Sequence, residues 1–148
     1  MLLLRSEIIK EKHRMLDHLD VLQELYPELT KEAYQDELDL MIAHNYSQLA
    51  IYDADHCIAI CGIWIGNKLW IGKYLELDNI VVRASYRSSG VGEYMFKIIE
   101  QKAKEENCNM LALDSYTSNF KAHKFFYNKG FSPKGFHFIK LLNKKAVR

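Results

Sequence analysis

A glycine-containing segment near the middle of the chain is the strongest candidate for chemistry. Residues 86–92 have the sequence Tyr-Arg-Ser-Ser-Gly-Val-Gly and join an apolar run at 75–82 to an amphipathic stretch at 90–107. A helix N-terminus presents unpaired N–H groups and the positive end of the helix dipole, and glycines let an anion approach the backbone closely. Arg87 adds a guanidinium that suits a phosphate oxygen. We therefore predict that this segment binds phosphate.

The glycine spacing separates this segment from two other phosphate-binding loops. The dinucleotide fingerprint needs three glycines as G-x-G-x-x-G, and only Gly90 and Gly92 are present here. A Walker loop needs a lysine directly after its last glycine, where this chain has Glu93. Two glycines at a helix start also occur without a chemical role, so the segment alone leaves both interpretations open.

Two carboxylates lie on the apolar run just before this segment. Glu76 and Asp78 are two residues apart, so in a strand both project to one face, opposite Leu75 and Leu77. A carboxylate beside a binding site could act as a general base. Either residue could serve, and the alternative is that both are solvated on the sheet surface.

The same run breaks the alternation of a regular strand. Leu75 and Leu77 are at odd positions, whereas Ile80 and Val82 are at even ones. Strict alternation cannot bring both pairs to one face, so we predict a β-bulge near Asp78–Asn79. The alternative is a strand whose second half is buried on both faces.

The apolar pattern also predicts the elements that would position these residues. A strand–helix–strand order around the helix at 90–107 predicts a parallel pair within a mixed sheet. A length of 148 residues suits a single domain, 1–148. The expected elements are a strand at 2–5, a helix at 14–26, a helix after Thr30, hairpin strands at 48–53 and 57–65, a long strand at 73–83, the helix at 90–107, a strand at 110–113, a helix at 119–128, and one or two closing strands at 131–142.

Two separate motifs together resemble the GNAT superfamily of N-acetyltransferases. Arg87-x-x-Gly90-x-Gly92 is similar to the acetyl-coenzyme A signature of that family. Residues 119–131, Asn-x-x-Ala-x-x-Phe-Phe-x-x-x-Gly-Phe, are similar to a second family segment. The resemblance implies an α/β fold (an α+β mixed sheet) with six to seven mostly antiparallel strands, one parallel pair splayed around the cofactor, and about four helices.

The resemblance also implies roles for particular residues, with acetyl-coenzyme A as acetyl donor and no metal. The backbone of residues 81–83 would pair with the pantetheine arm, the 87–92 loop would hold the pyrophosphate, and the arm would also bond Asn119, which is a plausible helix N-cap as well. The residues implied for cofactor binding are Val81, Val82, Arg83, Arg87, Ser88, Ser89, Gly90, Val91, Gly92, Asn119 and Phe126.

The implied reaction is direct attack of a primary amine on the thioester. An N–H near Val82 would stabilise the oxyanion, and Glu76 or Asp78 would act as the base. Many family members carry tyrosine where this chain has Phe126, and that tyrosine protonates the departing thiolate. Here Tyr127 or water would have to replace it.

Composition limits the partners. A net charge of +1 disfavours an extended nucleic-acid surface, three cysteines suit a reducing compartment, and no run is long enough to span a membrane. We expect a cytoplasmic enzyme for a small-molecule or peptide amine, with a homodimer possible. Two alternatives are an acetyl-coenzyme A-binding sensor or scaffold without turnover, and a toxin-like acetyltransferase on aminoacyl-tRNA, which the near-neutral charge disfavours.

Overall fold

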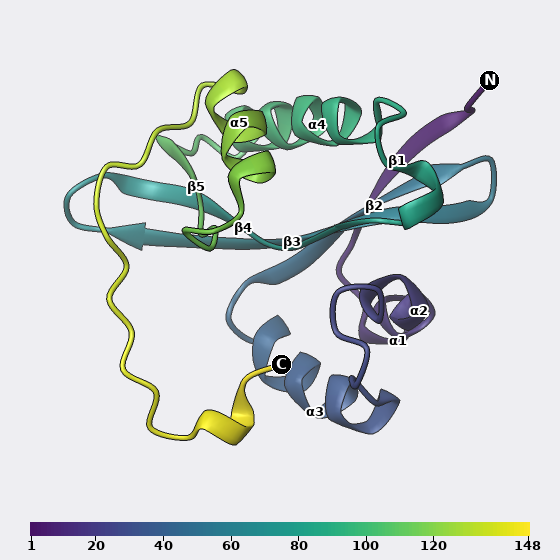
Figure 1. The fold of residues 1–148 in the computed structure, drawn as a ribbon, viewed down its shortest axis with the longest axis horizontal. Helices are drawn as coiled ribbons and strands as arrows, with labels where there is room; N and C mark the ends of the chain where they lie inside the picture. Colours follow the sequence, from purple (N-terminus) through teal and green to yellow (C-terminus); the bar gives the residue numbers. More distant parts are fainter. The chain divides into compact units, whose positions relative to one another are not determined.

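A computed structural model describes residues 1–148 (Figure 1). It divides into two compact units, residues 1–112 and 113–148, with β5 crossing the boundary. The elements are β1 (Leu4–Ile9), α1 (Lys12–Leu16), α2 (Leu19–Leu22), α3 (Lys31–Ile42), β2 (Tyr46–Asp53), β3 (His56–Lys68), β4 (Gly72–Val82), α4 (Val91–Glu105), β5 (Met110–Leu113) and α5 (Phe120–Asn128), with 3₁₀ turns at Ala84–Tyr86 and Lys144–Ala146.

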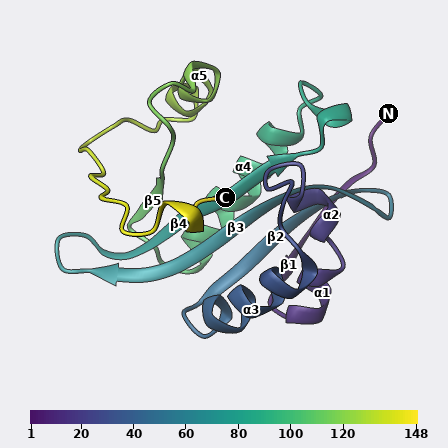
Figure 2. The same cartoon turned by 60° about the horizontal axis from the view of Figure 1, so that its bottom comes forward.

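The first unit is built on a mixed sheet with strand order β1-β2-β3-β4-β5 (Figure 2). β1 to β4 are joined as an antiparallel meander. α4 then crosses back, so that β5 begins beside the start of β4, where the Asn109 N–H donates to the Lys73 carbonyl at 2.8 Å. The mixed α/β sheet of the sequence prediction is therefore confirmed.

Helices cover both faces of this sheet within the first unit. α1, α2 and α3 lie on one side and α4 on the other (Figure 1). The α1–α3 side holds one continuous apolar cluster that includes Met15, Leu38 and Ile60. Leu75 and Leu77 of β4 are buried but lie outside that cluster, as strand alternation requires for side chains on the opposite face.

Two parts of the element prediction are wrong. There are five strands rather than six to seven, because residues 131–142 form no strand and leave Phe136 and Phe138 exposed. Pro133 has no N–H and Gly135 no side chain to pack, and both weaken strand pairing. There are five helices rather than about four, because the stretch at 14–26 splits into α1 and α2 where His18 leaves helical geometry (φ −109°, ψ 20°).

The bulge prediction is confirmed. The β3–β4 register passes from the pair Gly62·Asp78 to the pair Ile60·Val81, so two residues of β4 oppose the single residue Cys61. Asn79, one of those two, adopts a left-handed backbone with φ 50°. Val81 consequently joins the apolar cluster on the α1–α3 side, which returns its neighbours Ile80 and Val82 to the α4 side.

Candidate active site

The end of β4 presents one residue whose backbone turns away from β3. The Arg83 N–H donates to the Ile58 carbonyl at 2.9 Å, which makes Arg83·Ile58 a hydrogen-bonded pair. Such pairs alternate along antiparallel strands, so Val81 also directs its polar groups toward β3, and Val82 directs its own away. Of the three residues predicted to pair with a cofactor arm, only Val82 therefore has backbone groups aimed outward.

The chain then turns into the predicted phosphate loop. The 3₁₀ turn at Ala84–Tyr86 is closed by the Tyr86 N–H, which donates to the Arg83 carbonyl at 2.8 Å. The side chain of Arg87 folds back, and its Nε donates to the Val82 carbonyl at 3.2 Å. The guanidinium thus sits directly beside the outward-facing backbone of Val82.

Left-handed backbone conformations bring the loop into α4. Ser88 and Gly90 have φ angles of 59° and 87°, and the Ser89 hydroxyl donates to the Tyr86 carbonyl. The first bond within α4 runs from the Tyr94 N–H to the Gly90 carbonyl at 3.1 Å. The N–H groups of Val91 and Gly92 precede it and have no acceptor within the helix, which is the arrangement that binds an anion.

The loop also leaves room for a ligand beside Gly90. A Cβ placed on Gly90 would meet no atom within 4 Å. The residues predicted to hold a pyrophosphate, 87–92, therefore form one continuous turn with an unobstructed approach at Gly90, and this geometry fits a phosphate group. No group of three or more His, Cys, Asp or Glu side chains is arranged to hold a metal ion.

The two candidate bases differ in their contacts. Asp78 accepts from the indole N–H of Trp64 at 3.0 Å with one oxygen and from the Asn79 N–H at 2.8 Å with the other. Glu76 lies opposite Trp64 in the register and has neither a hydrogen bond nor an ion pair. Both project to one face, opposite Leu75 and Leu77 as predicted, and only the carboxylate of Glu76 accepts no hydrogen bond from the protein.

The sequence analysis missed Asn79 and the aromatic hydroxyls that hold it. The Asn79 side chain accepts from the Tyr46 hydroxyl at 2.8 Å and donates to the Tyr26 hydroxyl at 2.9 Å. Gly62, across the strand, makes room for this contact, because a Cβ there would lie 2.7 Å from Asn79 Oδ1. The break in alternation located the bulge, but no sequence signal identified the partners.

The remaining predicted site residues belong to the second unit. Asn119 caps α5 by accepting from the Ala122 N–H at 3.4 Å. The ring of Phe126 packs against Phe131 with centroids 6.0 Å apart, while Tyr127 is 57% exposed. Asn119 thus performs the structural role expected of an N-cap, and the roles proposed for these residues toward a cofactor remain predictions.

The thiols have pKa values unsuited to nucleophilic attack. Burial raises the pKa of Cys57 to about 11 and raises the pKa of Cys61 further, and burial also raises the pKa of Cys108. A thiol needs its thiolate form to react, so these residues are protonated and inert near neutral pH.

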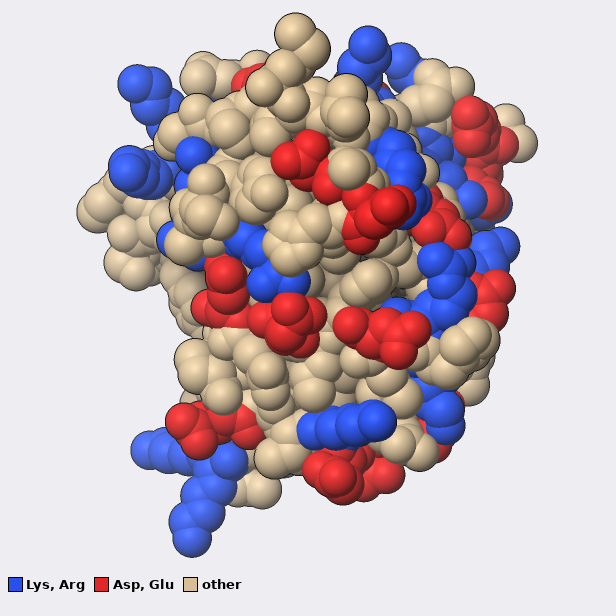
Figure 3. Space-filling model, turned by 90° about the vertical axis from the view of Figure 1, so that its right-hand side faces the viewer, with Lys and Arg blue, Asp and Glu red and all other residues tan.

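Acidic and basic side chains are interspersed on the face shown in Figure 3. No helix is both long enough and apolar enough to span a membrane.

The protein thus has a mixed α/β sheet, with an open turn between a bulged strand and a helix whose geometry fits a phosphate group. Residues 13–131 match the model of the acetyltransferase (GNAT) family. Because this match covers most of the chain, the protein belongs to the GNAT family of acetyltransferases.

One curated relative is a Bacillus subtilis (strain 168) protein provisionally named ribosomal protein bS18-alanine N-acetyltransferase. It is 27% identical over 107 residues, which are 72% of this chain and 66% of the relative. The match thus spans just under two thirds of that relative's length.

Solved structures share the fold. The aminoglycoside acetyltransferase AAC(6')-Iy, bound to a bisubstrate analogue of coenzyme A and acetylneamine, has a TM-score of 0.80 at 15% identity, with 95% of this chain and 98% of that one covered. AAC(6')-Ih from Acinetobacter baumannii has a TM-score of 0.74 at 22% identity, with 95% and 99% covered. Glucosamine-6-phosphate N-acetyltransferase from Arabidopsis thaliana has a TM-score of 0.69 at 19% identity, with 94% and 99% covered.

Proposed function

We propose that this protein transfers an acetyl group from acetyl-coenzyme A to a primary amine, as a single domain over residues 1–148. The observation that carries the proposal is the continuity of donors from Val82, through Arg87, to the open N-terminus of α4. The N–H groups of Val91 and Gly92 would hold the pyrophosphate and Val82 would pair with the pantetheine arm. The family match crosses both compact units, which supports a single domain.

The acetyl group arrives as a thioester, and the residues of the chain supply orientation and proton transfer. The Val82 N–H would donate to the carbonyl oxygen as it becomes an oxyanion, a type of interaction worth about 10²–10³-fold in rate. The Arg87 guanidinium, bonded to the Val82 carbonyl, would hold that backbone in place. The amine attacks directly, which agrees with the raised thiol pKa values.

Glu76 is our proposed general base. An ammonium must lose a proton before it can attack, and Glu76 has free oxygens, whereas Asp78 uses both of its own on Trp64 and Asn79. Asp78 would then orient the strand and add negative charge that favours a cationic amine. The departing thiolate would take its proton from Tyr127 or from water, because Phe126 has no hydroxyl.

For the acetyl acceptor we propose only a chemical class, the primary amines. Related proteins are named for the alanine of a ribosomal protein, for aminoglycosides and for glucosamine 6-phosphate. A suitable first panel is therefore a peptide with an N-terminal alanine, neamine and glucosamine 6-phosphate, with release of the coenzyme A thiol as readout. Binding of acetyl-coenzyme A without turnover on this panel, extended to other amines, would favour the sensor alternative.

Cofactor binding is tested by thermal unfolding with and without acetyl-coenzyme A. Ligand at about 100 times its Kd should stabilise the protein by roughly 2.7 kcal/mol. Gly90→Asp should abolish the shift, because a carboxylate would repel the pyrophosphate. Gly130→Asp is a matched control: both glycines have φ 87° and no atom within 4 Å of an added Cβ, so the backbone cost is equal. No shift with wild-type protein at millimolar ligand would reject the proposal.

The assignment of the base is tested by Glu76→Gln. We expect kcat to fall by roughly 10²–10⁴-fold with little change in acetyl-coenzyme A affinity, and the loss to shrink at high pH, where the free amine predominates. Asp78→Asn is the comparison. A larger loss in Asp78→Asn, with the same pH rescue, would assign the base to Asp78 instead.

A further inference from the structure

The bulge in β4 is held by a clamp of neutral side chains, which we call the bulge clamp: Asn79, Tyr26 and Tyr46. Tyr46 on β2 is 3% exposed and donates to Asn79 from within the apolar cluster, and Tyr26 accepts from Asn79 on the loop between α2 and α3. Tyr46 is itself held by Gln48, which is fully buried and also donates to Tyr34. These bonds link Asn79 to side chains on β2 and on the loop after α2.

The clamp is one of three tethers between the same two segments. Three hydrogen bonds join residues 20–26 to residues 79, 83 and 84. The Arg83 guanidinium donates to Asp20 at 2.5 Å, the Ala84 N–H donates to Glu24 at 2.9 Å, and Asn79 donates to Tyr26 at 2.9 Å. Residues 20–26, here called the 20–26 segment, are therefore bonded to the chain before and after Val82 and to the turn at Ala84.

We propose that Asn79 is a positioning residue for acetyl transfer: through Tyr26 and Tyr46 it fixes the β4 bulge, and thereby holds Val82 and the proposed base Glu76 in register with each other. This inference rests on the proposed function. The argument is geometric. Glu76 lies before the extra residue of the bulge and Val82 after it, so the two keep a fixed relation only while the bulge stays between them, as the bonds of Asn79 to Tyr26 and Tyr46 ensure. If the bulge moved past Val82 or were lost, Val82 would exchange its face and its hydrogen-bonding direction relative to Glu76.

The left-handed backbone of Asn79 explains the residue type. Asparagine tolerates positive φ better than other residues with side chains, and glycine tolerates it fully. Asn79→Gly therefore keeps the backbone conformation and removes only the side chain of the clamp. Tyr26→Phe removes only the bond between Asn79 and the 20–26 segment. Tyr34→Phe is the control, because it removes a buried bond to Gln48 at 2.7 Å and leaves Asn79 and its two partners in place.

The first measurement is hydrogen exchange of the Arg83 and Ala84 amides in protein without ligand, well below the melting temperature. Both amides have defined acceptors, Ile58 and Glu24. We expect exchange to speed up about tenfold in Asn79→Gly, less in Tyr26→Phe, and not in Tyr34→Phe. Unchanged exchange in Asn79→Gly would overturn the proposal.

The second measurement separates positioning from loss of stability. In Asn79→Gly we expect a roughly 10- to 100-fold lower kcat on the best amine of the panel, with the KM for that amine changed less than about threefold. Tyr34→Phe should melt earlier but keep both constants. Equal melting shifts and equal kcat in the two variants would reject a positioning role. If wild-type protein binds no acetyl-coenzyme A, the proposed function fails, while the exchange result still decides whether Asn79 fixes the strand.

Discussion

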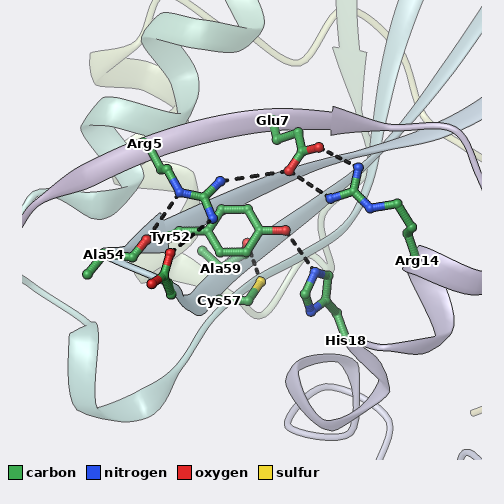
Figure 4. A network of polar contacts seen from close by, with 9 residues as sticks. Arg5, Glu7, Arg14, His18, Tyr52, Ala54, Cys57 and Ala59 are labelled. Atoms are coloured by element: carbon green, nitrogen blue, oxygen red, sulfur yellow. Dashed lines mark hydrogen bonds and ion pairs between the residues drawn. The ribbon is translucent and has the colours of Figure 1, made fainter.

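Two polar clusters stabilise the first unit by different physical means. The bulge clamp consists of uncharged groups, of which Tyr46 is buried and Asn79 and Tyr26 are half-buried. The second cluster, here called the β1 cluster, consists of Arg5, Glu7, Arg14, His18 and Tyr52 at the junction of β1, β2 and the first helices (Figure 4). Arg14 binds Glu7 with both ends of its guanidinium, Arg5 lies 3.9 Å above the Tyr52 ring, and the Tyr52 hydroxyl is 2.8 Å from His18 Nε2.

The two clusters differ in how their contributions to stability depend on pH and salt. Burial raises the pKa of Tyr34 to about 12 and raises that of Tyr46 as well, so the network around the clamp stays neutral through the physiological range. The β1 cluster contains groups that titrate and pairs that salt can screen. The clamp is thus suited to hold fixed geometry, whereas the β1 cluster contributes stability that depends on conditions.

Gly62→Val should give the largest effect and break the clamp. Its side chain would enter space occupied by Asn79 and Tyr46, whose nearest atoms would lie 2.7 Å from the new Cβ. Overpacking of this kind costs about 1–3 kcal/mol or more of unfolding free energy, which urea denaturation measures. Gly135→Ala, where no atom lies within 4 Å, should change stability by less than about 0.5 kcal/mol. Similar losses in both variants would contradict the tight contact at Gly62.

Tyr46→Phe should cost about 1–3 kcal/mol, because it leaves Asn79 Oδ1 and the amide of Gln48 without the shared hydroxyl. We expect this cost to be the same at 0.1 M and 1 M NaCl and between pH 6 and pH 8. Urea titrations under these conditions test it. A cost that shrinks with salt would mean that the clamp depends on charge after all.

Glu7→Gln should have a smaller effect, at most about 1 kcal/mol, because the pair with Arg14 is partly exposed. High salt should reduce it further. The Arg14 side chain lowers the pKa of Glu7, so this contribution is complete above the unfolded value of 4.5 and is lost as pH falls through the lower folded value. A difference between wild type and variant that persists at pH 2 would contradict this assignment.

His18→Gln should give the smallest effect, visible only as a pH slope. Burial lowers the pKa of His18 below 6.5, so the unfolded chain binds the proton more readily than the folded chain does. Wild-type stability should therefore fall as pH decreases from 7.5 through 6.5, and the variant should fall less steeply. Parallel stability curves would show that His18 titrates alike in both states.

Much of the fold could be predicted from the spacing of apolar residues, because a helix or strand that buries one face repeats them with its own period. The odd-to-even change between Leu77 and Ile80 located the bulge, and the apolar stripe after Gly90 located α4. Periodicity fails where a segment does not bury a face. Residues 131–142 alternate like a strand but form none, and the single stripe at 14–26 hid the break at His18.

The site was less accessible to sequence reasoning. The phosphate loop has a local signature, because consecutive residues build it. The clamp does not: Tyr26 and Tyr46 lie 53 and 33 residues from Asn79, and only the folded sheet brings their hydroxyls together. The outward turn of Val82 likewise depends on which pairs of the β3–β4 ladder exchange hydrogen bonds, and this cannot be derived from residue types.

The tight contact at Gly62 has a consequence for how this sequence can change over generations. Any side chain there collides with both Asn79 and Tyr46, so a substitution at Gly62 is tolerated only after both partners have become smaller. The reverse order passes through a less stable intermediate. Three positions on three strands therefore form one evolutionary unit, in which the history of replacements is constrained as much as the replacements themselves.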